Sequence, residues 1–175
     1  DTEGRIEIDA KAKDEGDRST IINGYVSPRH NYIDLGIQAN NTRAEFMESF
    51  CNSFMDNVNA DINGTVNVVG PLNNINLVGK AEVNGSIRIS SLNTTYWMRG
   101  DSVRFIPDEI KFLGDTIYDR NGNIGILTGS VYHKHLTNLS YDLNIEAHNL
   151  LAYDTHTFGD NTFYGTAYTL SLIHI

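Results

Sequence analysis

The fold is decided by residues Asn57 to Ser90, which read NVNADINGTVNVVGPLNNINLVGKAEVNGSIRIS. Apolar residues and glycines take every second position on both sides of the central sequence Gly70-Pro71-Leu72-Asn73-Asn74. A period of two places one face of a β-strand in apolar surroundings and the other face in water. The glycine, proline and asparagines at the centre are typical of a turn. We therefore predict a hairpin whose arms are about twice as long as the usual ~5–6 residues.

The same alternation continues on both sides of this hairpin, so we expect an all-β fold. The 175 residues fit one domain or one slice of a longer repetitive protein. Further strands are predicted at residues 5–13, 19–27, 33–39, 94–98, 102–106, 109–113, 115–118, 124–133, 137–148 and 162–168.

One segment, Thr42–Asp56, has a different period. Thr42-Arg43-Ala44-Glu45 has the form of a capping box, and three phenylalanines follow at intervals of four residues. This spacing predicts an amphipathic helix of about four turns. Its polar face is acidic, which argues against a membrane-surface helix, because such helices carry basic residues on that face. We expect the helix to cover part of the sheet.

Glycines recur in the apolar phase of the predicted strands. A glycine inside a strand marks a bend or a close approach of another backbone, and such bends allow a sheet to curl. The glycines that we expect to curl the sheet are Gly24, Gly64, Gly79, Gly85, Gly129 and Gly165.

Long strands with one continuous aliphatic face need something to cover that face. The sheet can close into a sandwich or barrel with a packed core, or it can curl into an open groove whose floor holds an apolar ligand. Periodicity does not choose between the two. If the groove forms, we expect its lining to consist of Ile62, Val66, Val68, Leu77, Val83, Ile87, Ile89, Leu143 and Ile145.

Composition and motifs argue against several other functions. The net charge of −9 argues against nucleic-acid binding. His133 and His135 have the spacing of two metal ligands on one strand face, but no further ligands follow at a diagnostic interval. Asp154, His156 and Asp160 form a candidate acid–base cluster that a solvated loop explains equally well. We therefore expect a non-enzymatic protein without a cofactor or metal ion.

The central region resembles a known family. A helix at Thr42–Asp56, then Ile62–Gly70, Pro71–Gly79 and Lys80–Ser90, is similar to the repeated unit of the TamB and AsmA-like translocation and assembly module family. The resemblance implies an elongated, curled, mainly antiparallel sheet that forms a U-shaped groove, with one amphipathic helix. It also implies a periplasmic protein of Gram-negative envelopes, anchored in the inner membrane through a segment absent here.

The resemblance further implies lipid transport between the inner and outer membranes, outer-membrane protein assembly, or both. Phospholipid acyl chains would be the ligand, and an outer-membrane barrel would be the partner of the full-length protein. Residues 1–169 would be one groove segment of a larger repetitive protein. Separately, residues 170–175 resemble a translated transposon end used in sequencing libraries, so we expect a non-native tail there; the alternative is an ordinary strand, since Leu170 and Leu172 alternate. The alternative is a closed sandwich or solenoid that binds glycans or acts as an adhesin through Tyr96, Trp97 and outward Asn and Thr residues.

Overall fold

The structure is a computed structural model that describes residues 4–13, 16–45, 55–134, 137–156, 165–169 and 172–174. No α-helix occurs among these residues; a short 3₁₀ helix, η1, covers Pro28–His30. The strands are β1 (Ile6–Lys13), β2 (Ser19–Ser27), β3 (Tyr32–Arg43), β4 (Met55–Pro71), β5 (Asn76–Ile89), β6 (Thr94–Ile106), β7 (Glu109–Tyr118), β8 (Ile124–Lys134), β9 (Thr137–Ala147), β10 (Leu151–Thr155), β11 (Gly165–Tyr168) and β12 (Leu172–His174).

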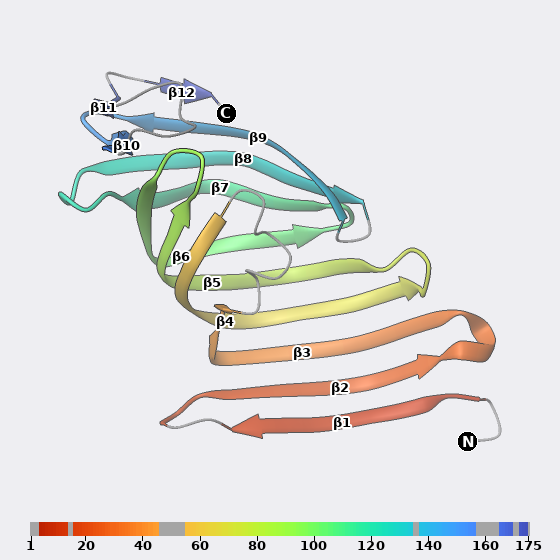
Figure 1. Ribbon diagram of the computed structural model, residues 1–175. Coiled ribbons are helices and arrows are strands. Elements are labelled where there is room, and N and C mark those ends of the chain that lie inside the picture. Colours follow the sequence, from red (N-terminus) through yellow and green to blue (C-terminus); the bar gives the residue numbers. More distant parts are fainter. Residues whose placement is uncertain are drawn as a thin grey trace.

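Ten of these strands form one antiparallel sheet in the order β1-β2-β3-β4-β5-β6-β7-β8-β9-β12. The chain therefore runs as a meander from β1 to β9, in which each of the first eight strands pairs with the next one in sequence, and β12 then pairs with β9. The sheet is not closed, since β1 and β12 are its two edges. Strands β10 and β11 pair with each other in a small second sheet above the β7–β9 end, as Figure 1 shows. The all-β prediction is confirmed.

The predicted central hairpin is confirmed as β4 and β5, which are 17 and 14 residues long. Its register pairs Ile62 with Val83, Val66 with Gly79 and Val68 with Leu77. Residues directly opposite each other in a sheet point to the same face. The apolar residues of both arms therefore share one face, as the alternation requires.

Two rows of cross-strand partners show how different the two faces of the sheet are. One row contains no charged residue across nine strands: Ala10, Ile22, Ile37, Val66, Gly79, Phe105, Ile110, Val131 and Tyr141. We call the face that carries this row the inner face. The adjacent row lies on the outer face and is mostly polar: Lys11, Ile21, Gln38, Thr65, Lys80, Arg104, Lys111, Ser130 and Asp142.

The prediction of a helix over Thr42–Asp56 is wrong at both ends. Thr42 pairs with Ile62 in the β3–β4 ladder, and Asp56 pairs with Arg88 in the β4–β5 ladder. The Thr42 hydroxyl bonds Thr20 Oγ1 at 2.8 Å and the backbone oxygen of Ser19, so it is not a helix cap. At both ends of this segment the residues therefore pair as β-strands and do not form a helix. Residues 46–54 lie outside the described part of the chain.

Strands β6 and β7 are longer than predicted, because each continues through a glycine at which we expected a break. Gly100 and Gly114 have φ values of +84° and +111°. The register shifts between Val83 and Asn84 opposite β6, and between Leu113 and Asp115 in β7. These are irregularities of the β-bulge kind, which insert a residue without ending a strand. Strand β10 was not predicted.

One end of the inner face is covered by the small sheet. The β5–β6 loop curls out of the large sheet towards β10, as Figure 1 shows, and the Leu92 oxygen accepts a hydrogen bond from the Asp154 amide at 3.1 Å. Leu150 and Leu151, at the start of β10, are 0% and 2% exposed. The main buried cluster therefore lies at this end and consists of Tyr96, Met98, Val103, Ile117, Ile145, Ala147 and Leu150.

Five of the six glycines expected to curl the sheet allow neighbouring strands to approach closely. A Cβ atom on Gly79 would lie 2.2 Å from the Thr65 oxygen, and one on Gly129 would lie 2.2 Å from the Asp142 oxygen. Contacts this short exclude any side chain unless the backbone moves. Gly24, Gly64 and Gly85 show the same kind of contact, whereas a Cβ on Gly165 would meet nothing within 4 Å.

Candidate functional site

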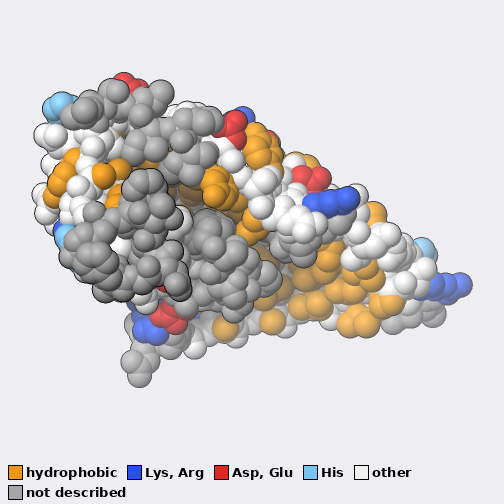
Figure 2. Space-filling model, turned by 45° about the horizontal axis from the view of Figure 1, so that its top comes forward, with side chains coloured by type: hydrophobic (Ala, Val, Ile, Leu, Met, Phe, Trp, Pro, Cys, Tyr) orange, Lys and Arg blue, Asp and Glu red, His pale blue; other side chains and the backbone are white. Residues whose placement is uncertain are grey.

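The inner face contains an apolar pocket of about 160 Å³ between the β5–β6 end of the large sheet and β7–β9. Figure 2 shows hydrophobic side chains gathered in a hollow of the molecule. A dry cavity of about 150 Å³ with an aliphatic and aromatic lining is large enough for benzene. The pocket therefore has room for a short alkyl segment. Its lining consists of Met55, Ile87, Ile89, Ser91, Leu92, Tyr96, Met98, Phe112, Ile117, Leu127, Val131, Tyr141, Leu143 and Ile145.

The pocket follows directly from the register of the strands. Phe112 lies opposite Gly129, which lies opposite Leu143, so the missing side chain of Gly129 leaves space between two large ones. Ile87 lies opposite Tyr96 at the other wall. Tyr141 is 48% exposed, which places one lining residue in contact with solvent.

The hydroxyl of Tyr96, one of the polar groups in the pocket lining, is hydrogen-bonded within the protein. The Tyr96 hydroxyl donates to the Leu151 oxygen at 2.9 Å. Burial raises the pKa of Tyr96 to about 12, and the negative charge of Asp119 adds to this effect, while a hydrogen bond with Thr94 opposes it. Tyr96 is therefore neutral over the physiological range, and the pocket offers apolar contact as its main interaction.

Asp119 holds β10 against the end of the large sheet next to the pocket. Its Oδ2 atom accepts hydrogen bonds from the Leu151 amide and from Asn123 Nδ2, both at 2.9 Å. Its Oδ1 atom accepts from the amides of Asn121 and Asn123. Burial acts to raise the pKa of Asp119, but these hydrogen bonds outweigh it and hold the pKa below the usual range. The β7–β8 turn is thereby tied to β10.

The predicted lining residues all belong to the hydrophobic side of the sheet, but only some of them meet at the pocket. Ile87, Ile89, Leu143 and Ile145 line it. Ile62 and Val83 pack against the neighbouring buried cluster of Ala44, Val58 and Ala60. The remaining three, Val66, Val68 and Leu77, lie further along the inner face, half-buried and outside the pocket.

Sequence reasoning missed the β6–β8 part of the lining. Met98 and Ile117 lie opposite each other on the inner face, as do Leu127 and Ile145. Alternation within β8 carried a usable signal for Leu127 and Val131. In β6 and β7 the bulges at Gly100 and Gly114 interrupt the period, so the phase could not be followed through them.

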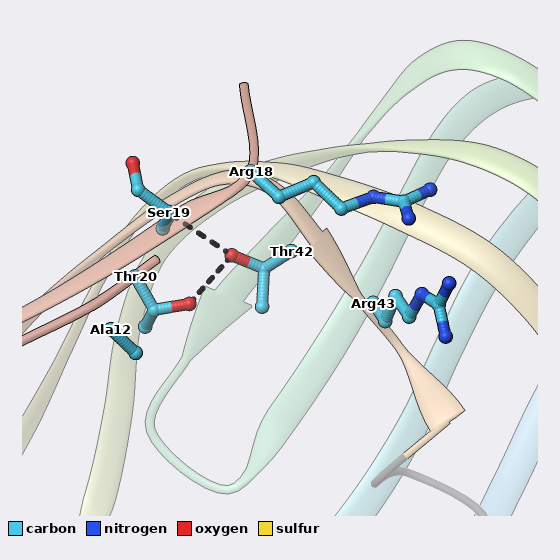
Figure 3. A pocket seen from close by; sticks show the side chains of 6 residues that line it. All are labelled: Ala12, Arg18, Ser19, Thr20, Thr42 and Arg43. Atoms are coloured by element: carbon cyan, nitrogen blue, oxygen red, sulfur yellow. Dashed lines mark hydrogen bonds between the residues drawn. The ribbon is translucent and has the colours of Figure 1, made fainter. Parts of the chain in front are cut away.

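A second pocket, of about 190 Å³, lies where β1 ends and β2 begins. Figure 3 shows its residues Ala12, Arg18, Ser19, Thr20, Thr42 and Arg43. Arg18 pairs with Asp61 at 3.2 Å, and Arg43 pairs with Glu45 at 3.8 Å. Because both guanidinium groups already face a carboxylate, this pocket lacks the free positive charge of an anion site.

The candidate metal ligands are not brought together in the described part of the chain. His133 is buried on β8, and His135 lies outside the described residues. No group of three or more His, Cys, Asp and Glu residues that could hold a metal ion occurs among the residues described. Nor does any helix in that part of the chain have the length and hydrophobicity needed to cross a membrane.

The buried carboxylate of Asp154 holds three parts of the chain together. It is 5% exposed, and its carboxylate contacts Arg120 at 2.5 Å, His156 Nε2 at 2.7 Å and Thr166 Oγ1 at 2.9 Å. Burial acts to raise the pKa of Asp154, but Thr166, His156 and Arg120 outweigh it and lower the pKa. The carboxylate joins β10 to β11 and to the β7–β8 turn. Asp160 lies outside the described residues.

Comparison with protein-family models, with curated proteins and with solved structures found no match to this chain.

Proposed function

We propose that this chain is a non-enzymatic module that binds apolar chains, such as the acyl chains of phospholipids, on its inner face. The observation that carries the proposal is the apolar pocket of about 160 Å³ in a sheet that is not closed. Apolar surface removed from water contributes roughly 25 cal/mol per Å². An alkyl segment is therefore the ligand chemistry that this lining favours.

The inner face extends well beyond the pocket. The uncharged row from Ala10 to Tyr141 crosses nine strands, and all of its residues except the buried Val131 are half-buried or exposed. A groove along this face, U-shaped and floored by aliphatic side chains, would lead an acyl chain towards the pocket. The closed end at β10 would then be the end of the path within this segment.

The biological setting that we propose is the Gram-negative periplasm. The resemblance of the strand sequences Ile62–Ser90 to TamB and AsmA-like repeats supports it, whereas the helix that the resemblance also implied is absent at both ends of Thr42–Asp56. The chain would be one groove segment of an envelope-spanning protein that moves lipids between the inner and outer membranes or assists outer-membrane protein assembly with a barrel partner. The anchor in the inner membrane would belong to another part of that protein.

The alternative of a glycan-binding or adhesin module has less support. A closed sandwich does not fit the open sheet. The expected aromatic platform is divided between the two faces, because Tyr96 is 8% exposed and bonded to Leu151, whereas its neighbour Trp97 points the opposite way. Glycan-array binding by the purified chain, without binding of lipid, would favour this alternative.

A matched pair of substitutions on β8 tests the proposed function. Leu127 lines the pocket, whereas its neighbour Ile126 is 39% exposed on the outer face. We expect Leu127→Trp to fill the pocket and to weaken binding of a fluorescent long-chain fatty acid by about tenfold, which equals the loss of about two buried methylene groups. Ile126→Trp should leave the affinity nearly unchanged.

Two further measurements complete the test. Circular dichroism and urea unfolding of both variants establish that each is folded. Mass spectrometry of the purified parent chain should detect co-purified phospholipid. Equal affinities of the two folded variants, or no binding by the parent chain, would rule out the pocket as the ligand site.

A further inference from the structure

Strand β1 is an edge strand with an unusual charge pattern. It pairs with β2 on one side, and no other described strand pairs with it. Its eight residues contain no proline, and its register with β2 has no irregularity. Natural edge strands are usually protected by prolines, bulges, inward-pointing charges or charged edge residues such as lysine. Of these devices β1 has only the charged residues, so it can pair with another strand whose charges match its own.

The inner side of β1 remains apolar up to the edge. Ile6, Ile8, Ala10 and Ala12 continue the inner-face rows of β2 and β3, and Ile6 is 58% exposed. The rows therefore end at the edge with an apolar side chain in water. A further strand with the same alternation would bury it.

The outer side of β1 carries charges that face no opposite charge on β2. Glu7, Asp9, Lys11 and Lys13 alternate along it and are all exposed. The residues opposite them on β2 are Tyr25, Asn23, Ile21 and Ser19, none of which is charged. An amide nitrogen of Asn23, when turned towards Asp9, lies 2.8 Å from its Oδ1 atom, which leaves the carboxylate charge in place.

These charges complement each other when the strand is paired with itself. A twofold axis through Ala10 and perpendicular to the sheet aligns two β1 strands antiparallel. Lys11 then lies opposite Asp9 of the second copy, and Lys13 lies opposite Glu7, with both pairs repeated by symmetry. Opposite charges in direct cross-strand positions are stabilising, and like charges are destabilising.

Neighbouring registers lack this match. An axis through Asp9 places the Asp9 side chains of the two copies opposite each other, and an axis through Lys11 does the same with the two Lys11 side chains, so each register contains a like-charge pair. An axis through Ile8 places Glu7 opposite Asp9. Every residue-centred register keeps each side chain on its own face. Charge therefore selects the register centred on Ala10.

We propose that the β1 edge is a docking surface for a second copy of this chain, paired antiparallel with the twofold axis at Ala10. The two large sheets then form one continuous sheet, with both inner faces on the same side. Ile8 of one copy lies opposite Ala12 of the other on this apolar face. This association is independent of which ligand the inner face binds.

Charge reversal provides the main test, using the whole 175-residue chain in analytical ultracentrifugation at low salt. Each of Asp9→Lys and Lys11→Asp creates two like-charge pairs across the twofold axis. We expect either one to raise the dimer dissociation constant by at least about tenfold. Asp9→Lys combined with Lys11→Asp restores both opposite-charge pairs. The dimer dissociation constant of this double variant should lie within about threefold of the value for the parent chain. Because both positions are exposed, the variants should remain folded.

A cross-linking test fixes the register. In a Cys51→Ser background, Ala10→Cys places two thiols on the axis, where opposed Cα atoms lie about 4.5–5.5 Å apart, within the range of a disulfide. Ala12→Cys is the control, since the two thiols would be about 13 Å apart along the strands. Mild oxidation should give covalent dimers of the first variant only. A chain that stays monomeric, equal cross-linking of both variants, or a double charge variant as weak as the single ones would overturn the proposal.

Discussion

The hydroxyl of Tyr96 on β6 and the backbone oxygen of Leu151 on β10 are joined by a buried hydrogen bond of 2.9 Å. Leu151 also donates its amide to Asp119, so both of its backbone groups are held by side chains of the large sheet and its turn. This arrangement closes one end of the inner face. It depends on three residues that are far apart in the sequence.

Replacing Tyr96 with Phe should weaken this closure. The substitution leaves the Leu151 oxygen buried without its donor, which costs about 1–3 kcal/mol. Urea unfolding at neutral pH measures the loss in the free energy of unfolding. Tyr132→Phe serves as the matched control, because that tyrosine is 43% exposed and should change the stability by less than about 0.5 kcal/mol.

Alkaline pH offers an independent test of the same residue. Because the pKa of Tyr96 is raised from 10.0 to about 12 in the folded protein, the unfolded chain releases this proton first as pH rises. The contribution of this pKa difference to the free energy of unfolding is therefore fully present below pH 10 and is lost between pH 10 and 12. It amounts to about 3 kcal/mol. The Tyr96→Phe variant should lose less stability than the parent over that interval. Parallel pH profiles for the two proteins would contradict this explanation.

Asp119 should affect the pH dependence of the free energy of unfolding at acidic pH. Its lowered pKa means that the folded protein favours the carboxylate, so its contribution is present above the ordinary Asp range and is lost as pH falls through the folded pKa. Asp119→Asn places an amide group among four donors and should cost about 1–3 kcal/mol at neutral pH. Acid unfolding followed by circular dichroism should show a weaker pH dependence for the variant. Asp34→Asn, at an exposed site, is the control.

The alternation of residues was sufficient to predict most of the sheet. In β4 and β5 it is unbroken from Val58 to Ile89 except at the turn, and the observed register keeps the apolar residues on one face. Local pattern and tertiary pairing agree there. The Thr42 capping pattern failed because the Thr42 hydroxyl finds partners on β2, which no local rule can detect.

The pocket was less predictable than the sheet. Its lining requires the relative phase of β5 to β9, and the bulges at Gly100 and Gly114 shift that phase in the two middle strands. The cover at one end depends on Leu151 and Asp154, which lie in a segment without clear alternation. Such contacts between distant segments leave no periodic signal in the sequence.

Gly129 should tolerate no side chain. Its φ of +108° and the 2.2 Å approach to the Asp142 oxygen mean that alanine would have to displace β9. We expect Gly129→Ala to cost more than about 3 kcal/mol in urea unfolding, since backbone strain and a steric clash add. Gly36→Ala is the control, because its nearest neighbour would be 3.5 Å away and its φ is not positive. Similar losses for both variants would show that the close approach does not matter.

The inner face contains one buried carboxyl group that opposes its apolar character. Asp115 lies opposite Leu127, which lies opposite Ile145, and Asp115 is 4% exposed. Burial raises its pKa; a hydrogen bond from the Leu113 amide opposes this, and the charge of Asp101 adds to it. The folded protein therefore binds this proton more readily than the unfolded chain does.

Replacing Asp115 with Asn should consequently stabilise the protein at neutral pH. The free energy of unfolding of the parent falls as pH rises from the ordinary Asp range through the raised pKa, because the folded state then carries a buried charge. The amide oxygen of Asn can still accept the Leu113 hydrogen bond, which is 3.0 Å long. Urea unfolding should show the variant to be more stable than the parent at neutral pH, with the difference vanishing below about pH 3. A variant that is less stable at neutral pH would mean that the Asp115 charge is needed at this position, and that a positively charged group faces it.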